Sequence, residues 1–293
     1  MADLSGWTIG VIGLGHMGVP MARNLARAGA AVHVASRSPE PVALLAGEGM
    51  TAHKVARTLA VAVDTVIVMV TDTDAVDRVL HGSDGVIAGL APGKLVIDMS
   101  TTKVRETRAW AAEVEAAGCA WLDAPVSGGQ VGAEQATLAI MAGGRDESFA
   151  RALPLFQTLG RNVTHIGGIG AGQVAKAANQ VIVGVTLAAV AEALTLAAKA
   201  GVDPARVRTA LRSGFAESRV LELHGQRMIE RNFAPGGHAT VQLKDLNQVL
   251  ELADQLGIAL PTIAANRELW QKLIDMGHGK LDQSGIIRAV EDA

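Results

Sequence analysis

In the first 166 residues of this chain, short apolar runs alternate regularly with helix-like segments. Uninterrupted apolar strands separated by helices are typical of a parallel sheet that is covered on both faces. The runs are TIGVIG (8–13), AVHVAS (31–36), TVIVMV (65–70), KLVIDM (94–99), AWLDAP (120–125), TLAIMAGG (137–144) and VTHIG (163–167). Helices are expected over 17–28, from residue 39, over 74–80 and over 103–117. The alternation predicts a Rossmann-type doubly wound α/β domain over residues 1–166.

The pattern changes after GGIGAG (167–172), where strand-like runs give way to helical ones. Proline and glycine clusters such as Pro204, Pro235 and GHG (277–279) separate the segments. Helices are expected over 173–199, 204–213, 217–231, 243–256, 261–277 and 282–291. We therefore expect a linker and long inter-domain helix over 167–200, and an all-helical domain over 201–293.

Composition excludes several classes of protein. With 293 residues, 49% of them apolar, the chain can build two sizeable cores. A net charge of -3 and a pI near 6.2 give no electrostatic footprint for nucleic acid or an anionic membrane. The single cysteine, Cys119, rules out an internal disulfide framework and reads as a buried small hydrophobe.

We expect a cytoplasmic protein without a membrane span. The N-terminal sequence lacks the basic and apolar regions of a signal peptide. The apolar segment 177–198 is long enough to cross a bilayer, but Asn179, Gln180 and Glu192 interrupt it, so a buried central helix is the better interpretation.

The motif G-x-G-x-x-G occurs as Gly13, Gly15 and Gly18, directly after an apolar strand and at the start of a helix. In that context the three glycines allow a tight turn, close approach of a pyrophosphate and close packing of helix on strand. The free N–H groups of the helix then bind phosphate. A dinucleotide should contact this turn, including its intervening residues Leu14, His16 and Met17.

Ser36, Arg37 and Ser38 follow the second strand, where an acidic residue would bind the ribose 2′-hydroxyl of NAD. An arginine between two hydroxyls suits a 2′-phosphate, so we predict that NADPH is preferred. If Arg37 only stacks on adenine, NAD is usable as well.

Two further motifs suggest a substrate site. Ser127 and the amides of Gly128 and Gly129 follow a strand and form a donor cluster suited to a carboxylate, although a serine-capped glycine turn would look the same. Lys176 and Asn179 are three residues apart and share one helix face. Hydride arriving at a carbonyl carbon leaves an alkoxide, and a lysine ammonium supplies both a proton and a positive charge. No metal is indicated, because the eight histidines lack ligand spacing.

Four stretches occur together in an order and spacing that resembles the β-hydroxyacid dehydrogenase family: GLGHMGVPMARNL, DAPVSGG, GAGQVAKAANQ and LKDLNQVL. The resemblance covers essentially the whole chain. It implies that Lys176 is the catalytic lysine, that Asn179 orients the substrate, and that Ser127, Gly128 and Gly129 hold its carboxylate. It also implies that Thr101 lies near nicotinamide and substrate and that Lys244 closes the cleft over both. Val70 and Thr71 replace the usual leucine–proline pair beside the cofactor.

The resemblance implies a reductase that interconverts a short semialdehyde acid and its 3-hydroxy acid with NAD(P). Stretches such as AEALTLAAKAGVDP and RNFAPG look most like the family members that reduce tartronate semialdehyde to glycerate. Oxidation of 3-hydroxyisobutyrate and reduction of glyoxylate or succinic semialdehyde are the alternatives. Gly237 replaces a phenylalanine common at the substrate pocket, and Gln180 replaces a second asparagine.

Two more distant alternatives are an imine reductase and a catalytically silent binding module. Lys176 counts against both, since such proteins usually lack the lysine. The expected partners are a small carboxylate-bearing substrate and further copies of the chain, as a homodimer or homotetramer, because the helical domain carries more apolar surface than one layer can bury.

Overall fold

The computed structural model describes residues 2–292 of the chain. These residues form two compact units, one up to Lys176 and the other from Ala177 onward, and the division falls within one long helix, α8 (Ala171–Lys199). The domain boundaries expected at residues 166 and 200 enclose this helix, and they stay a prediction.

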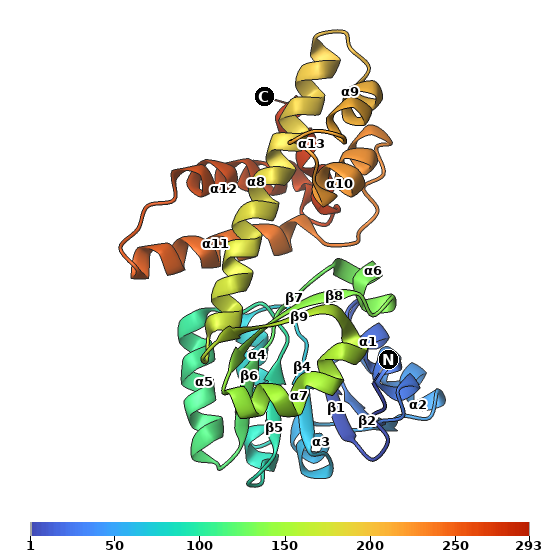
Figure 1. Cartoon of the computed structure of the whole chain (residues 1–293), viewed down its shortest axis with the longest axis vertical. Helices are drawn as coiled ribbons and strands as arrows, with labels where there is room; N and C mark the ends of the chain where they lie inside the picture. Colours follow the sequence, from blue (N-terminus) through green and yellow to red (C-terminus); the bar gives the residue numbers. More distant parts are fainter. Residues whose placement is uncertain (1, 293) are drawn as a thin grey trace. The chain divides into compact units, whose positions relative to one another are not determined.

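Within the described residues, a nine-stranded sheet forms the centre of the first unit (Figure 1). Its path is β3–β2–β1–β4–β5–β6–β8–β7, with β9 paired to β8. The first six positions have the 3-2-1-4-5-6 order of a dinucleotide-binding fold, which confirms the predicted Rossmann-type domain. The strands are β1 (Thr8–Ile12), β2 (Ala31–Ala35), β3 (Thr51–Ala52), β4 (Thr65–Val68), β5 (Leu95–Asp98), β6 (Ala120–Asp123), β7 (Val126–Ser127), β8 (Leu138–Gly144) and β9 (Gly160–Gly167).

The sheet is mixed rather than wholly parallel, because β8 runs antiparallel to both β6 and β7. The chain reaches β8 from β7 through α6 (Gly129–Glu134), a helix of six residues. A crossover to a parallel neighbour needs about a dozen residues or more, so this short connection reverses the chain direction instead.

Helices cover both faces of the sheet and create two separate cores. Along β5, Leu95 and Ile97 enter one core while Val96 enters the other, which explains the uninterrupted apolar runs of the sequence. The first core is covered by α1 (Gly18–Arg27), α2 (Pro39–Gly47), α6 and α7 (Asp146–Leu159). The second is covered by α3 (Ala56–Ala62), α4 (Thr73–Leu80), the short helix η1 (Ile87–Gly89) and α5 (Val104–Ala116).

Six of these elements were not predicted from the sequence: β3, β7, α3, η1, α6 and α7. The two strands have two residues each, too few for a periodic signal. Helix α7 contains Pro154, which normally ends a helical pattern.

The second unit is helical, as expected. Its core gathers apolar side chains from every long helix, with Trp270 and Leu246 fully buried. The elements after α8 are α9 (Pro204–Leu211), α10 (Arg219–Ile229), α11 (Ala239–Gln255), α12 (Pro261–Leu273), η2 (Ile274–His278), η3 (Gln283–Ile286) and α13 (Ile287–Glu291). Helix α11 begins four residues earlier than predicted. The helix expected over 261–277 ends in a π turn near Gly277, whose φ of 81° is outside the helical range.

The first turn of α8 lies directly against the sheet. A Cβ on Gly172 would be 2.4 Å from the carbonyl oxygens of Asp123 and Met141, and one on Gly143 would be 2.6 Å from the amide nitrogen of Gly172. Only glycine fits at both positions, since backbone meets backbone there. These contacts fix where α8 starts, and Lys176 lies one helical turn after Gly172.

Among the described helices, α8 alone is long and apolar enough to cross a membrane by length and composition. Its side chains Leu187, Ala191 and Leu194 lie in the core of the second unit. A core helix of a soluble protein has these same properties, and the structure is compatible with one.

Candidate active site

The predicted cofactor residues of the first unit lie where the parallel strands end. The glycine-rich turn follows β1, Ser36 follows β2, Val70 follows β4 and Thr101 follows β5. Because these strands are parallel neighbours, their carboxyl ends share one edge of the sheet, the edge at which open α/β sheets bind ligands.

Each of the three glycines of the turn is needed for a different physical reason. Gly13 has a φ of +99°, and a Cβ there would be 2.2 Å from the Met69 carbonyl oxygen. A Cβ on Gly18 would be 1.9 Å from the Gly13 carbonyl oxygen. A Cβ on Gly15 would meet nothing within 4 Å. The fold thus requires Gly13 and Gly18, whereas Gly15 leaves space that a pyrophosphate would fill.

Helix α1 begins without a competing anion. Its N-cap, Met17, makes no side-chain capping bond, and the first turn has no acidic residue. Free N–H groups and the partial positive charge of a helix N-terminus favour phosphate. Leu14 is buried, while Gly15 and His16 are exposed beside this terminus. The residues present fit a dinucleotide.

At the end of β2 the side chain of Ser36 is half-buried, and Arg37 and Ser38 are exposed. Ser38 is the N-cap residue of α2 and makes no side-chain capping bond. Arg37 therefore projects from a short loop between a strand and a helix, where a 2′-phosphate can be reached.

The loop after β4 is joined to the loop after β5. The Val70 amide donates a hydrogen bond of 3.0 Å to Oγ of Ser100. Thr71 donates from Oγ1 to the carboxylate of Asp72, which also caps α4 by accepting from the Ala75 amide. Backbone geometry at the unusual Val70–Thr71 pair is thus held by Ser100 and Asp72.

Two aspartates at the ends of neighbouring strands lie side by side below this edge. Asp98 of β5 and Asp123 of β6 are register partners, and both are fully buried. Burial raises the pKa of Asp98 to about 7, and the neighbouring Asp123 adds to the increase. Hydrogen bonds from Ser100 and Thr102 act in the opposite direction and lower the pKa. Burial raises the pKa of Asp123 to about 6, although backbone N–H groups act to lower it.

Each buried carboxyl group organises a different segment. Asp98 accepts from the Ser100 amide at 2.9 Å and from the Thr102 hydroxyl at 3.1 Å, which shapes the loop that carries Thr101. Asp123 accepts from the amides of Gly170 at 2.7 Å and Gln173 at 3.0 Å, which are donors at the start of α8.

Lys176 is 7% exposed, and it lies on α8 one turn after Gln173. A buried lysine at the carboxyl edge of a dinucleotide-binding sheet is a candidate functional residue. Ser127 ends β7, and Gly128 and Gly129 follow with φ values of +133° and +60° at the start of α6. The Ser127 side chain is half-buried and both glycines are exposed, so their donors are accessible.

In the second unit, Asn179 and Lys244 are connected through two residues between them. Asn179 donates to the Gln180 side chain at 2.7 Å, and Gln180 donates to Oδ2 of Asp245 at 2.6 Å. Nζ of Lys244 lies 3.0 Å from the other oxygen of Asp245. Gln180 thus reaches Asp245 directly, although an asparagine is usual at its position. That these residues and those of the first unit act on one substrate stays a prediction.

The glycine at the usual phenylalanine position belongs to a tightly held loop. The amides of Gly236 and Gly237 donate to Asp282, and His238 contacts the Lys280 carbonyl through Nδ1. Phe233 is buried in the helical core between the guanidinium groups of Arg231 and Arg288. The buried phenylalanine of this segment is therefore a core residue of the helical unit.

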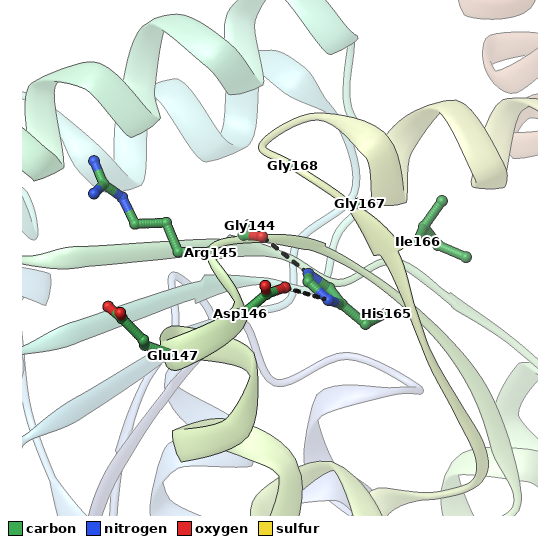
Figure 2. Close-up of a pocket in the computed structure, with 8 residues that line it drawn as sticks. All are labelled: Gly144, Arg145, Asp146, Glu147, His165, Ile166, Gly167 and Gly168. Carbon is green, nitrogen blue, oxygen red and sulfur yellow. Dashed lines mark hydrogen bonds and ion pairs between the residues drawn. The ribbon is translucent and has the colours of Figure 1, made fainter.

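A separate hollow of about 660 Å³ lies where β8, α7 and β9 meet, and Figure 2 shows its lining. The His165 ring points between the Gly144 carbonyl at 2.9 Å and the Asp146 carboxylate at 3.2 Å, and it stacks on Phe149. None of the predicted site residues lines it. Within residues 2–292, no group of three or more His, Cys, Asp or Glu could hold a metal ion.

Sequence reasoning missed Asp98, Ser100, Asp123, Gln173 and Asp245. A signal for two of them was present: LVID and AWLD place an aspartate at the last position of consecutive apolar strands. An acid at the end of a fully buried strand needs partners, and its position next to an identical neighbour predicts a coupled pair.

Comparison with known proteins identifies the class. Residues 8–167 match the NAD binding domain of 6-phosphogluconate dehydrogenase, and residues 170–290 match the NAD-binding domain of NADP-dependent 3-hydroxyisobutyrate dehydrogenase. The chain therefore belongs to the β-hydroxyacid dehydrogenase family, of the 3-hydroxyisobutyrate dehydrogenase type, and it is an NAD(P)-dependent oxidoreductase.

Individual relatives cover nearly the full length. The chain is 46% identical to 2-hydroxy-3-oxopropionate reductase of Escherichia coli (strain K12), over 97% of each chain. It superimposes on 3-hydroxyisobutyrate dehydrogenase from Salmonella typhimurium with a TM-score of 0.88 and 33% identity, over 96% of this chain and 99% of the other. The corresponding values for the Mycobacterium tuberculosis 3-hydroxyisobutyrate dehydrogenase with L-serine are 0.87, 31%, 97% and 99%.

We expect Gly15→Ala to weaken binding of NADPH about tenfold or more, because its methyl group occupies the space left for the pyrophosphate. Stability should remain within about 0.5 kcal/mol of wild type, since the methyl group meets no protein atom. Calorimetric titration and thermal unfolding measure the two effects. Gly18→Ala is the matched control and should lose about 1–3 kcal/mol of stability through its clash with Gly13. Unaltered NADPH affinity in Gly15→Ala would contradict the assignment.

The Asp98 carboxyl should make stability depend on pH. Its folded-state pKa of about 7 lies above the ordinary 3.8, so the folded state holds the proton more tightly. The contribution of this proton to the free energy of unfolding is complete below pH 3.8 and is lost as the pH rises through 7. Asp98→Asn stays neutral; its oxygen can accept from the Ser100 amide while its NH₂ group donates to the Thr102 hydroxyl. Between pH 5 and 8, the wild type should lose about 1–3 kcal/mol relative to the variant in urea unfolding. Parallel profiles would refute the raised pKa.

Proposed function

We propose that the protein reduces tartronate semialdehyde (2-hydroxy-3-oxopropionate) to glycerate, with NADPH as the preferred cofactor. The observation that carries this proposal is the buried Lys176, fastened near the carboxyl edge of a dinucleotide-binding sheet. Identity of 46% over 97% of the length with an enzyme named for this substrate supports it.

The proposed reaction gives each predicted site residue a separate role. Bound nicotinamide supplies the hydride that adds to the aldehyde carbon. Lys176 donates a proton to the aldehyde oxygen as that oxygen gains charge, so that semialdehyde, NADPH and one proton give glycerate and NADP⁺. A dry, preorganised site makes the ammonium most effective at this step.

The remaining site residues bind and orient. Ser127 and the amides of Gly128 and Gly129 hold the substrate carboxylate, which fixes the aldehyde group relative to Lys176. Thr101 contacts nicotinamide and substrate, and Asn179 orients the substrate. Lys244, held by Asp245, closes over the carboxylate and cofactor.

Preference for NADPH rests on Arg37 and its neighbours. No carboxylate stands among Ser36, Arg37 and Ser38 to repel a 2′-phosphate, and the exposed guanidinium can pair with it. The protein is proposed to work in the cytoplasm.

The alternative within the family is 3-hydroxyisobutyrate oxidation, favoured by the likeness to two solved dehydrogenases of that name. The two functions differ in the substituent next to the reacting carbon, a hydroxyl in one substrate and a methyl in the other. A pocket that hydrogen-bonds the hydroxyl discriminates strongly against the methyl, since its polar groups are then left unpaired.

We expect tartronate semialdehyde to show the highest kcat/KM in a panel with glyoxylate, succinic semialdehyde and methylmalonate semialdehyde, each assayed with NADPH and NADH. Arg37→Ala should weaken NADPH binding about tenfold or more and leave NADH binding within about twofold, because only the 2′-phosphate loses a partner. Arg161→Ala removes the same charge from β9 and serves as control. Fastest turnover of methylmalonate semialdehyde would favour the alternative, and tighter binding of NADH than NADPH would refute the preference.

We also propose that the protein is a homodimer or homotetramer. Apolar side chains remain exposed in the second unit: Ile182 is 68% exposed, Leu196 72% and Phe215 fully. Association of two copies through such side chains would remove apolar surface from water, which is favourable. Light scattering at micromolar concentration should give at least twice the mass of 30.2 kDa, and a monomer mass would contradict the proposal.

A further inference from the structure

Gln173 has a position that the proposed mechanism does not yet use. It is 2% exposed and lies on α8 one helical turn before Lys176, on the same face. Its side-chain amide spans the loop after β5. The Thr102 amide donates to Oε1 at 3.1 Å, and Nε2 donates to the Ser100 carbonyl at 2.9 Å. The two peptide groups that it holds are those on either side of Thr101.

The backbone of Gln173 is held independently of its side chain. Its amide donates to Oδ2 of Asp123 at 3.0 Å, and the preceding Gly172 has no room for movement toward the sheet. Gln173 is therefore anchored to β6 through its backbone and to the β5 loop through its side chain.

The loop on the other side is equally constrained. Ser100 accepts from the Val70 amide, and Asp98 accepts from the Ser100 amide and the Thr102 hydroxyl. These bonds tie the loop to β4 and β5. Within this network, the side chain of Gln173 connects the loop directly to α8.

A purely structural amide would need only to satisfy buried backbone groups. This one joins the segment that carries the proposed nicotinamide contact, Thr101, to the turn that carries the proposed proton donor. Proton and hydride transfer require their groups within a few tenths of an ångström of the productive geometry, and a displacement of about 1 Å can cost about a hundredfold in rate.

We propose that Gln173 is a positioning residue for the reaction: it sets the place of Lys176 relative to Thr101 by joining the first turn of α8 to the loop after β5. The proposal rests on the proposed function of Lys176. Gln173 touches neither substrate nor cofactor in this role and acts through the two segments that it connects.

Gln173→Leu and Gln173→Glu test the role. Leucine has a similar size and makes neither hydrogen bond, whereas glutamate keeps the acceptor for Thr102 and places an oxygen against the Ser100 carbonyl. We expect kcat to fall about ten- to a hundredfold in both variants, with the NADPH dissociation constant within about twofold of wild type. Gln157→Leu, which removes an exposed amide from α7, is the control and should match wild type.

A double-mutant cycle separates positioning from structural support. If Gln173 acts through Lys176, Gln173→Leu should cause no further loss in a Lys176→Ala background. Equal losses in both backgrounds, or a kcat of Gln173→Leu within twofold of wild type, would overturn the proposal.

Hydrogen exchange keeps the proposal testable if the enzyme assay fails. If the wild type turns over no acid of the panel, the proposed function is refuted. The link that Gln173 makes between the loop after β5 and α8 is not refuted by that result. In that event, deuterium uptake of residues 99–103 and 171–176 should rise in Gln173→Leu while the rest of the chain is unchanged. Unchanged uptake in both segments would overturn the link, and Gln173→Glu replaces the leucine variant in this comparison if the latter does not fold.

Discussion

The Asp123 carboxylate, at the end of β6, fixes where α8 begins by accepting from two amides at the start of that helix. A helix that begins inside a protein has unpaired N–H groups, and a buried acceptor must satisfy them. An anion does this well because the helix terminus carries partial positive charge. The raised pKa of Asp123 reflects the cost of burying it. Glycine at 172 and 143 lets the backbones approach closely enough for these bonds to form.

The proposed catalytic residues Lys176 and Asn179 both lie on α8, after this anchor. The first turn belongs to the dinucleotide-binding unit and ends at Lys176, and Asn179 opens the part that belongs to the helical unit. In the helical unit, Gln180 and Asp245 link Asn179 to Lys244. Each unit therefore organises its own polar groups before a substrate arrives, which is the preorganisation that hydride and proton transfer need.

The sequence predicts the parts of this architecture that depend on periodicity and on glycine. Alternating apolar runs predict the doubly wound sheet, since each strand must feed two cores, and the spacing of Gly13, Gly15 and Gly18 predicts the phosphate turn. Short strands such as β3 and β7 are not predicted, because two residues are too few to show a periodic pattern of apolar side chains. The antiparallel direction of β8 follows from the short connection through α6, which apolar periodicity does not show. Helix α7 is not predicted because Pro154 interrupts its helical pattern.

Long-range pairing is the part that one sequence does not reveal. Asp98 and Asp123 are 25 positions apart and become neighbours only through strand register, and Gln173 reaches Ser100 and Thr102 only after α8 docks on the sheet. The motif DAPVSGG contains Ser127 and also Asp123, which holds the start of α8, and GAGQVAK contains Lys176 and also Gln173, which bonds the loop after β5. Residue type identified Lys176 and Ser127, whereas Asp123 and Gln173 required the fold.

The central claim, that Lys176 protonates an aldehyde reduced by nicotinamide hydride, is tested most directly with deuterium. Wild type and Lys176→Ala are given tartronate semialdehyde and NADPH deuterated at C4 on the transferred face, and the glycerate is analysed by mass spectrometry. The account predicts that wild type forms glycerate carrying one deuterium and that the variant forms it about a hundredfold or more slowly while still binding NADPH. Glycerate without deuterium, or equal rates in the two proteins, would contradict it.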